Sequence, residues 1–428
     1  GEEYMKKIFA LFLMLVLVLS GSGCGGNSPA ANDEAGKLNI YMLNDNQNVR
    51  NAIACYAEVA PDVEINIEVG VPDYDTTVSD ALKKLNTRLL SGNGPDIILM
   101  DDIQSESYIQ SGQILELTDI VEEAENLVSG VAENAKYDGK VYTIPLFVTL
   151  MANISRAEAS IDFSSLGKFN DSIKAENAVI GSFDRQAALW YRTQIEPELL
   201  WEGGITEEKL KTFYQDLYEQ MDMIYGNDED SRFASFQQIN LQALSGLAAP
   251  HVFFKKIGAA KEYIDTLSYL QMMCSMGNEE GLDFNFCRWQ DKTMYIPMNR
   301  MAISSKSQNS EGAAALIEYL ISEEGQQQIA ESTGCIPVNS KVLRSAMKNR
   351  EESEYVIGGA GSYKAKPFTG KDVDQICDLL NEKSYSVTTD GILMEIIMLG
   401  AQDYLNGNLS LDDATAQTLK KVGIYFAE

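Results

Sequence analysis

Histidine is the residue that most restricts the chemistry open to this chain, because His251 is the single one among 428 residues. One imidazole cannot supply a zinc site with two or three histidine ligands, nor several histidine-based catalytic centres. Carboxylates are plentiful, with 63 Asp and Glu against 34 Lys and Arg. A secreted hydrolase with two catalytic carboxylates stays open, since composition does not say which carboxylates meet in space. We interpret His251 as structural or as a solvated loop residue.

Motifs of other enzymes are not found. The chain has no Gly-x-Ser-x-Gly elbow, no Walker-type phosphate loop and no His-Glu-x-x-His pair. Gly358–Gly361 is rich in glycine but lacks the strand and helix that flank a dinucleotide-binding turn, so we interpret it as a loop. The formal net charge of -29 opposes a general attraction to phosphate backbones. We therefore expect no catalytic residue, no metal, no cofactor and no nucleic acid partner.

The amino-terminal residues predict export and a membrane anchor. Met5-Lys6-Lys7 precedes an apolar run from Ile8 to Leu19, and small residues lead to Cys24. This is the pattern of a signal peptide over residues 1–23, and the run is too short for the roughly 20 residues of a membrane-spanning helix. The small residues before Cys24 resemble the lipobox of bacterial lipoproteins, whose cysteine is lipidated. Ordinary cleavage that leaves a free Cys24 is the alternative.

Residues 24–36 are small and polar, as in a flexible tether. The later cysteines show neither CxxC nor metal-like spacing, which favours buried thiols and leaves one disulfide open.

The elements that would position a site begin after this tether. Residues 38–42 and 65–69 alternate as strands do, whereas 49–57 and 78–89 repeat apolar residues at helical spacing. Ile97–Met100 is a continuous apolar run, typical of a strand that is buried on both faces. The order β-α-β-α-β predicts a parallel sheet with helices on both faces. Ligands of such sheets bind beyond the carboxyl ends of the strands.

A second α/β unit is expected farther along the chain. Asn177–Gly181 is predicted as a strand, and residues 205–225 as an amphipathic helix with Thr206 as its N-cap. We expect the stretch 232–280 to be mainly helical and 282–297 to be extended.

Several motifs, in one order along the chain, resemble family 1 extracellular solute-binding proteins of the maltose-binding type. The resemblance covers most of residues 37–428 and is loose over 155–280. It is carried by Gly92-Asn-Gly-Pro-Asp96 before a strand, Gly112-Gln-Ile-Leu, Asp138-Gly-Lys-Val-Tyr-Thr-Ile-Pro145, Ile296–Asn309 and Gly334-Cys-Ile-Pro-Val-Asn339.

This resemblance implies an α/β fold of the type II periplasmic-binding-protein-like class, with two lobes, each a sheet flanked by helices, and three interdomain crossovers. It also implies a cleft that closes on a small solute and delivery to an ABC transporter permease by a monomer. The protein would lie on the extracellular face of the cell membrane, or on the periplasmic side if there is an outer membrane. We assign residues 37–146 plus 299–338 to lobe 1 and 147–298 plus 339–428 to lobe 2.

Candidate ligand contacts follow two strands of the first unit. Asn44, Asp45 and Asn46 come after the first strand, and Asp101 and Asp102 come after the third. Their short polar side chains suit hydrogen bonds with a solute, although helix capping is the alternative for each.

The remaining candidates belong to the crossovers and to the second unit. Trp289 could stack its indole on a sugar ring or could be a core residue. Residues of the first crossover could instead pack in the hinge. These candidates are Phe147, Thr149, Asp184, Arg185, Arg288, Trp289 and Tyr295.

The sequence thus predicts a lipid-anchored receptor for a small solute, with an oligosaccharide favoured over a peptide or a polyamine. The alternatives are a surface lipoprotein that acts as a sensor or adhesin on the same fold, and a secreted glycoside hydrolase. The acidic surface keeps a tethered body soluble, so it does not by itself indicate a cationic ligand.

Overall fold

The fold is that of a computed structural model. It describes residues 36–72, 75–177, 205–225, 252–254, 258–357, 361–381, 384–388 and 390–426. The predictions for the signal peptide, Cys24, the tether, Asp184, Arg185, His251, the strand over residues 178–181 and the loop at 358–360 lie outside these ranges. Among the residues described, no helix is long and apolar enough to cross a membrane.

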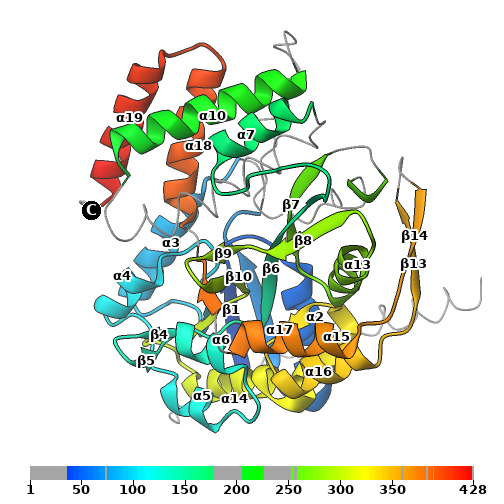
Figure 1. The fold of residues 1–428 in the computed structure, drawn as a ribbon. Helices are drawn as coiled ribbons and strands as arrows, with labels where there is room; N and C mark the ends of the chain where they lie inside the picture. Colours follow the sequence, from blue (N-terminus) through cyan, green and yellow to red (C-terminus); the bar gives the residue numbers. More distant parts are fainter. Residues whose placement is uncertain are drawn as a thin grey trace, which may run out of the picture. The chain divides into compact units, whose positions relative to one another are not determined.

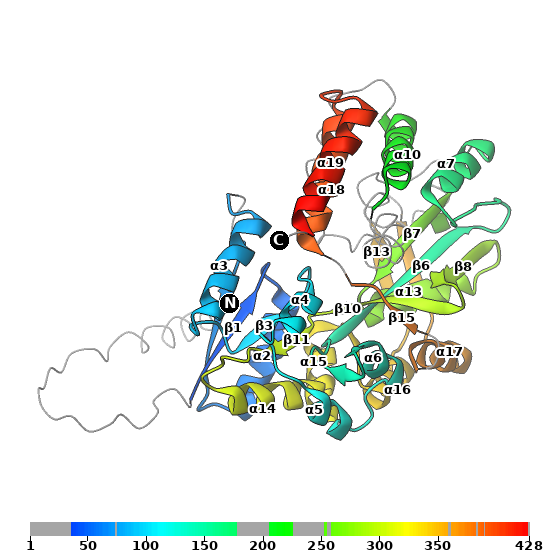
Figure 2. The ribbon, with the colours of Figure 1, turned by 90° about the vertical axis from the view of Figure 1, so that its left-hand side faces the viewer.

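The first sheet confirms the predicted β-α-β-α-β unit. Its strand order is β11-β3-β1-β2, where β1 pairs in parallel with β2 and β3, and β11 is antiparallel to β3. Strands β1, β3 and β11 are labelled in Figure 2. The intervening helices are α2 (Gln47–Val59) and α3 (Val78–Leu90). The strands are β1 (Lys37–Met42), β2 (Glu64–Val69), β3 (Ile97–Leu99) and β11 (Met301–Ile303).

Side-chain alternation in β1 places one hydrophobic cluster on each face of this sheet. Leu38 and Ile40 pack with α2, α14 (Ser310–Ile321) and α15 (Glu323–Thr333). Tyr41 lies on the other face with α3 and α4 (Ser105–Gln110). Because both faces are covered, β3 is apolar without alternation, as predicted.

The second sheet is organised around β6 (Phe147–Arg156), which is antiparallel to β7, β8, β10 and β12. Strand β15 is parallel to β10, and β9 pairs antiparallel with β10. The strands around β6 are β7 (Ala259–Ile264), β8 (Leu282–Phe286), β9 (Arg288–Trp289), β10 (Lys292–Met298), β12 (Ile336–Pro337) and β15 (Ser384–Ser386).

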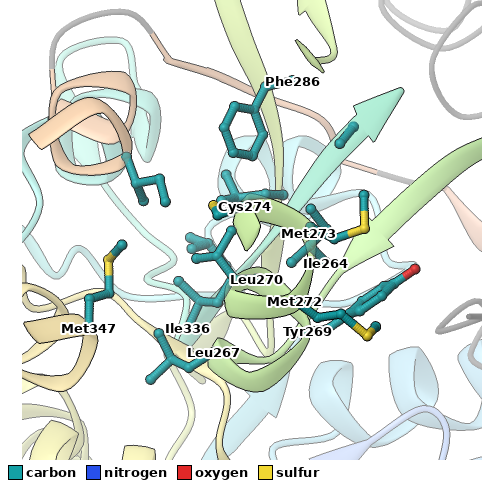
Figure 3. Packing of buried hydrophobic residues seen from close by; sticks show 14 of the residues in the cluster. Ile264, Leu267, Tyr269, Leu270, Met272, Met273, Cys274, Phe286, Ile336 and Met347 are labelled. Carbon is teal, nitrogen blue, oxygen red and sulfur yellow. The ribbon is translucent and has the colours of Figure 1, made fainter. Parts of the chain in front are cut away.

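One face of this sheet is covered by α13 (Leu267–Gly277), α16 (Ser340–Lys348) and α17 (Gly370–Asn381). Leu267 and Leu270 of α13 lie beside Ile336 of β12 in this core (Figure 3). The hairpin of β13 (Ser353–Ile357) and β14 (Gly361–Ala365) contributes Tyr363 to the same cluster.

Strand β7 corrects the expectation that residues 232–280 are mainly helical. Residues 259–264 are buried at every position and pair with β6. Since both faces are buried, the stretch shows no alternation, and its lysine and glutamate do not mark an exposed face. Long-range pairing decides its conformation rather than local propensity. The helical expectation holds for α13, and the extended one for β8, β9 and β10.

Four helices form a separate hydrophobic cluster, at the top of Figure 1. The N-cap predicted at Thr206 is confirmed, because its hydroxyl accepts a hydrogen bond from the Lys209 amide at 3.3 Å. The buried Tyr214 hydroxyl ties two of the helices together by donating to the Ile397 carbonyl at 2.8 Å. These helices are α7 (Leu166–Ala175), α10 (Glu207–Tyr225), α18 (Gly391–Leu405) and α19 (Leu411–Tyr425).

The chain passes between the two sheets near residues 146 and 298. However, β12 pairs with β6 of the second sheet, and α6 (Ser129–Asn134) packs against α17 and β15. The lobe boundaries assigned from the sequence therefore stay a prediction.

Near the first passage, α5 (Thr118–Glu123) and the hairpin of β4 (Lys136–Tyr137) and β5 (Lys140–Val141) complete the described elements. Asp138 and Gly139 turn this hairpin with φ of 48° and 80°, as a type I′ turn requires.

Candidate functional site

A cavity of about 140 Å³ lies where the chain passes between the two sheets. It is bounded by α4, by the end of α6 and by strands β10 and β15. Hydroxyl groups are frequent in its lining, together with a few charged side chains. The lining residues are Ser105, Glu106, Ile109, Val131, Asn134, Ala135, Lys136, Tyr137, Tyr142, Thr143, Pro145, Tyr295, Pro297, Arg300, Ser386 and Thr388.

Tyr295 is the predicted ligand contact that lines this cavity. Its side chain is 1% exposed, and the side chains of Asn134 and Ser386 hydrogen-bond its phenol oxygen. Burial raises the pKa of the Tyr295 phenol, so the group stays protonated at neutral pH. A neutral phenol can donate to a solute hydroxyl while it accepts from its protein partners.

Arg300 brings a fixed positive charge to the cavity wall. Its side chain is 6% exposed, and its guanidinium donates to the Met100 carbonyl, to the Ile103 carbonyl at 3.2 Å and to the Ser105 hydroxyl at 3.4 Å. Burial lowers the pKa of Arg300, an effect that nearby carboxylates oppose. The segment after β3 is thereby held against the return passage of the chain.

Asp101 lies next to Arg300 but outside the cavity, and it also connects the segment after β3 to the return passage of the chain. Its carboxylate accepts hydrogen bonds from the Asn299 side-chain amide at 3.1 Å and from the Arg300 backbone amide at 3.3 Å. Burial raises the pKa of Asp101 to about 6, although the neighbouring Arg300 acts in the opposite direction. Asp101 does not belong to the cavity lining. Its placement favours a role in positioning Arg300.

Asp102 has a positive φ of 57° and contacts the start of α18. Its carbonyl accepts a hydrogen bond from the Gly391 amide at 2.8 Å. A Cβ at position 391 would lie 3.0 Å from this carbonyl oxygen, which explains why glycine suits the contact. The segment after β3 therefore meets both the return passage and the carboxyl-terminal helices.

The polar residues after β1 act mainly on α2. The Asn46 side chain caps this helix by accepting from the amides of Asn48 at 2.9 Å and Val49 at 3.2 Å, the capping alternative named above. Asp45 forms an exposed ion pair with Arg50 at 2.7 Å. Asn44 is partly exposed beside them. They lie at the carboxyl end of β1, as predicted, but outside the cavity lining.

Phe147 and Thr149 are buried at the start of β6. Phe147 is 2% exposed within the cluster of the first sheet, and Thr149 lies opposite Ile296 in the second sheet. Neither residue lines the cavity. This placement favours the hinge-packing interpretation for both.

Trp289 forms an aromatic pair with Tyr385, whose ring centroid lies 4.7 Å away at an interplanar angle of 34°. The indole is partly exposed. Register places Tyr385 beside Met294 and Ser386 beside Tyr295. Because side chains alternate along a strand, the aromatic pair lies on the face of the sheet opposite to Tyr295 and the cavity. Arg288 donates to the Asp291 carbonyl in the adjoining turn.

Asp96, within the Gly-x-Gly-Pro-Asp motif, has a structural position. It is 3% exposed, and one carboxylate oxygen accepts from the Asn39 amide at 2.8 Å. The other accepts from the Ser307 hydroxyl at 2.6 Å and from the amides of Gln308 at 3.2 Å and Asn309 at 3.3 Å. The motif thus joins the start of β1 to the segment after β11.

The sequence reasoning did not select most of the cavity lining. Arg300 carried a weak signal, as a charged residue between two apolar strands. Asn134, Ser386 and Thr388 carried none, because they come from distant segments. No group of acidic, histidine or cysteine side chains that could hold a metal is found among the described residues. The cysteines of the described ranges are free, and Cys55 is the partly exposed one among them.

Comparisons with known proteins give the context of this geometry. A family model described as bacterial extracellular solute-binding protein matches residues 51–353. The diacetylchitobiose binding protein DasA of Streptomyces coelicolor is 24% identical over 151 residues, which are 33% of this chain and 35% of that protein. The match therefore spans about a third of the length of this curated relative.

Two solved structures share the fold over most of their length. An ABC substrate-binding protein from Listeria monocytogenes, in complex with cycloalternan, has a TM-score of 0.51 and 14% identity, with 91% of this chain and 99% of that chain covered. The GacH receptor of Streptomyces glaucescens, solved unliganded and with acarbose, has a TM-score of 0.53 and 14% identity, with the same coverage of 91% and 99%. These likenesses confirm the predicted fold class.

Proposed function

Because the chain belongs to the family of bacterial extracellular solute-binding proteins, we propose that it is a lipid-anchored receptor that captures a small solute by closure of two lobes. The solute is an oligosaccharide, and the receptor delivers it to an ABC importer. The cavity where the chain passes between the sheets is the observation that carries this proposal.

The lining of the cavity supports capture by closure. Ser105 and Glu106 follow β3 of the first sheet, whereas Tyr295 and Ser386 belong to the second sheet. A solute that touches both sets favours the arrangement in which they are close together. Differential contact of this kind is what allows a ligand to shift a conformational equilibrium.

Hydroxyl-rich walls support a sugar rather than a peptide or a polyamine. Hydroxyls of Ser105, Thr143, Tyr295, Ser386 and Thr388 can both donate to and accept from the hydroxyls of a sugar. The relatives that bind cycloalternan and acarbose point in the same direction. A volume of about 140 Å³ is below the ~300–1,000 Å³ usual for ligand pockets. We therefore expect one sugar unit to enter and the rest of an oligosaccharide to lie outside.

The Trp289–Tyr385 pair is a second proposed contact. A partly exposed aromatic surface suits stacking on the apolar face of a sugar ring. The aromatic pair lies on the opposite face of the sheet from Tyr295. One ligand can therefore touch both the pair and the cavity only if it extends around the edge of the sheet; otherwise the two places bind separate ligand molecules. Loss of affinity in Trp289→Ala would favour one extended ligand.

The anchor is proposed from the sequence. Lipidation of Cys24 after removal of residues 1–23 would leave the folded chain on a tether at the outer face of the cell membrane. In cells, Cys24→Ala is expected to release the protein into the medium. Retention of this variant in the membrane fraction would contradict lipid anchoring at Cys24.

A thermal-shift screen of the purified folded chain against mono- and oligosaccharides, peptides and polyamines tests the proposal. A ligand at 100 times its Kd stabilises the folded state by about 2.7 kcal/mol, which a melting curve resolves. Product formation from any stabilising sugar would favour the hydrolase alternative. Binding without an effect of gene deletion on uptake of that sugar would favour the sensor or adhesin.

A further inference from the structure

A buried lysine and a buried cysteine meet on one face of the second sheet. Lys261 lies on β7 and Cys287 directly follows β8, and their side chains are 3% and 4% exposed. The Lys261 Nζ lies 3.7 Å from the Cys287 Sγ. Neither residue lines the cavity, whereas Cys287 belongs to the hydrophobic cluster against which Trp289 and Tyr385 pack.

Strand register explains how two strands that do not pair with each other bring these groups together. Asn153 of β6 lies opposite Lys261 of β7 on one side and opposite Asn285 of β8 on the other. The lysine side chain therefore reaches across the central strand toward Cys287. The Cys287 thiol donates to the Asn153 side-chain carbonyl at 3.3 Å, which places all three groups on one face.

The surroundings of the pair restrict where the amine can go. The Lys261 ammonium lies 6.0 Å from the centre of the Phe163 ring, so an aromatic ring bounds it on another side. Burial raises the pKa of the Cys287 thiol, and the adjacent lysine acts against this rise. The sulfur thus keeps a cationic partner in a site from which bulk water is largely excluded.

We propose that Lys261 and Cys287 form a reversible covalent crosslink when the protein is oxidised by a peroxide. In the first step, the sulfur attacks the peroxide, an S–O bond forms as the O–O bond breaks, and hydrogen peroxide yields a sulfenic acid and water. In the second step, the Lys261 ammonium releases one proton, and the resulting amine nitrogen attacks this sulfur to form an S–N bond. The S–O bond breaks as the S–N bond forms, and the hydroxyl leaves as water with a second proton from the nitrogen. A sulfenic acid condenses with a backbone nitrogen to a sulfenamide in the same way, and here the lysine nitrogen is the one that lies beside the sulfur.

Proximity makes this route preferable to further oxidation. Near-attack geometry needs the reacting atoms about 3–3.5 Å apart. The nitrogen and the sulfur are 3.7 Å apart, so small rotations of the lysine side chain bring them into this range. Cys274 and Cys335 are also buried, but no lysine contact is found for either sulfur in the described part of the chain. The crosslink would tie β7 to the end of β8 and restrict the unfolded chain, as a disulfide does.

Peptide mapping of the full chain after treatment with hydrogen peroxide is the test. We expect the peptides that carry Lys261 and Cys287 to be joined, with a mass about 2 Da below their sum, and a thiol reductant to separate them. The melting temperature is expected to be higher before reduction than after it. Cys287 oxidised to sulfinic acid with Lys261 unmodified would overturn the proposal, and so would a Cys287 that stays reduced while Cys55 is oxidised.

Variants supply the matched controls. Lys261→Met and Cys287→Ser are expected to abolish the joined peptide, whereas Cys335→Ser keeps it. The wild-type peptide map decides the outcome even where a core variant folds poorly, because it needs no substitution. A joined peptide that persists in Lys261→Met would mean that another amine is the partner and would overturn the assignment.

Discussion

Asp101 provides a direct test of the electrostatics where the chain passes between the sheets. Burial raises its pKa from 3.8 to about 6, against the opposing effect of Arg300. A carboxyl group with a higher pKa in the folded chain than in the unfolded chain binds more protons when folded. The free energy of unfolding therefore falls as the pH rises from about 3.8 through about 6.

The size of the pKa difference sets the magnitude. At about 1.4 kcal/mol per pKa unit, a change from 3.8 to about 6 corresponds to about 3 kcal/mol of destabilisation at neutral pH. Asp101→Asn removes this charge, but it also takes one carboxylate away from Arg300 and places an amide beside the Asn299 amide. We therefore expect a net gain of about 1–2 kcal/mol at pH 7.5.

Urea unfolding of wild type and Asp101→Asn between pH 7.5 and pH 5 is the assay. The difference in unfolding free energy is expected to narrow by about 1.4 kcal/mol over this range, because wild-type Asp101 takes up its proton there. Asp45→Asn is the control, since Asp45 forms an exposed ion pair worth ~0–1 kcal/mol. A variant that is less stable than wild type at pH 7.5, or a difference that does not change with pH, would refute the reasoning.

Two further substitutions test the buried hydrogen bonds of Asp96 and the polar lining of the cavity. Asp96→Ala leaves the buried donors from Asn39 and Ser307 without their acceptor and is expected to lower the unfolding free energy by about 3 kcal/mol or more in urea titrations, whereas Asp96→Asn keeps an acceptor and loses less. Tyr295→Phe removes one hydroxyl from the cavity and is expected to weaken binding of the stabilising sugar by about tenfold in calorimetric titration. Because Asn134 and Ser386 lose a hydrogen-bond partner, the unfolding free energy of the free protein is also expected to fall, by about 1–3 kcal/mol. An unchanged affinity would place the solute elsewhere.

The aromatic pair and the cavity define a question about ligand length. A ligand confined to the cavity would lose affinity in Tyr295→Phe and not in Trp289→Ala. A ligand that extends past the sheet edge would lose affinity in both. The comparison therefore measures how far the bound sugar reaches, independently of its identity.

The sequence by itself determined the β-α-β-α-β unit of the first sheet and much of the local geometry. Alternation and helical spacing predicted β1, α2, β2, α3 and β3, because each pattern depends on neighbouring residues and on one buried face. The N-cap at Thr206 was predicted, and capping was the named alternative at Asn46, since a cap needs only its own first turn. The motif around Asp96 marked the family, and the structure supplies its hydrogen-bonding role.

Only the tertiary structure decided which residues share a site. Strand β7 has no periodicity of its own, and its pairing with β6 overrides a composition that resembles a helix. Tyr295 and Trp289 are close in sequence but face opposite sides of one sheet, because register and the twofold repeat of a strand separate them. Arg300 and Ser386 reach one cavity from distant segments. Such convergence depends on long-range packing, which leaves no mark in the local pattern of the chain.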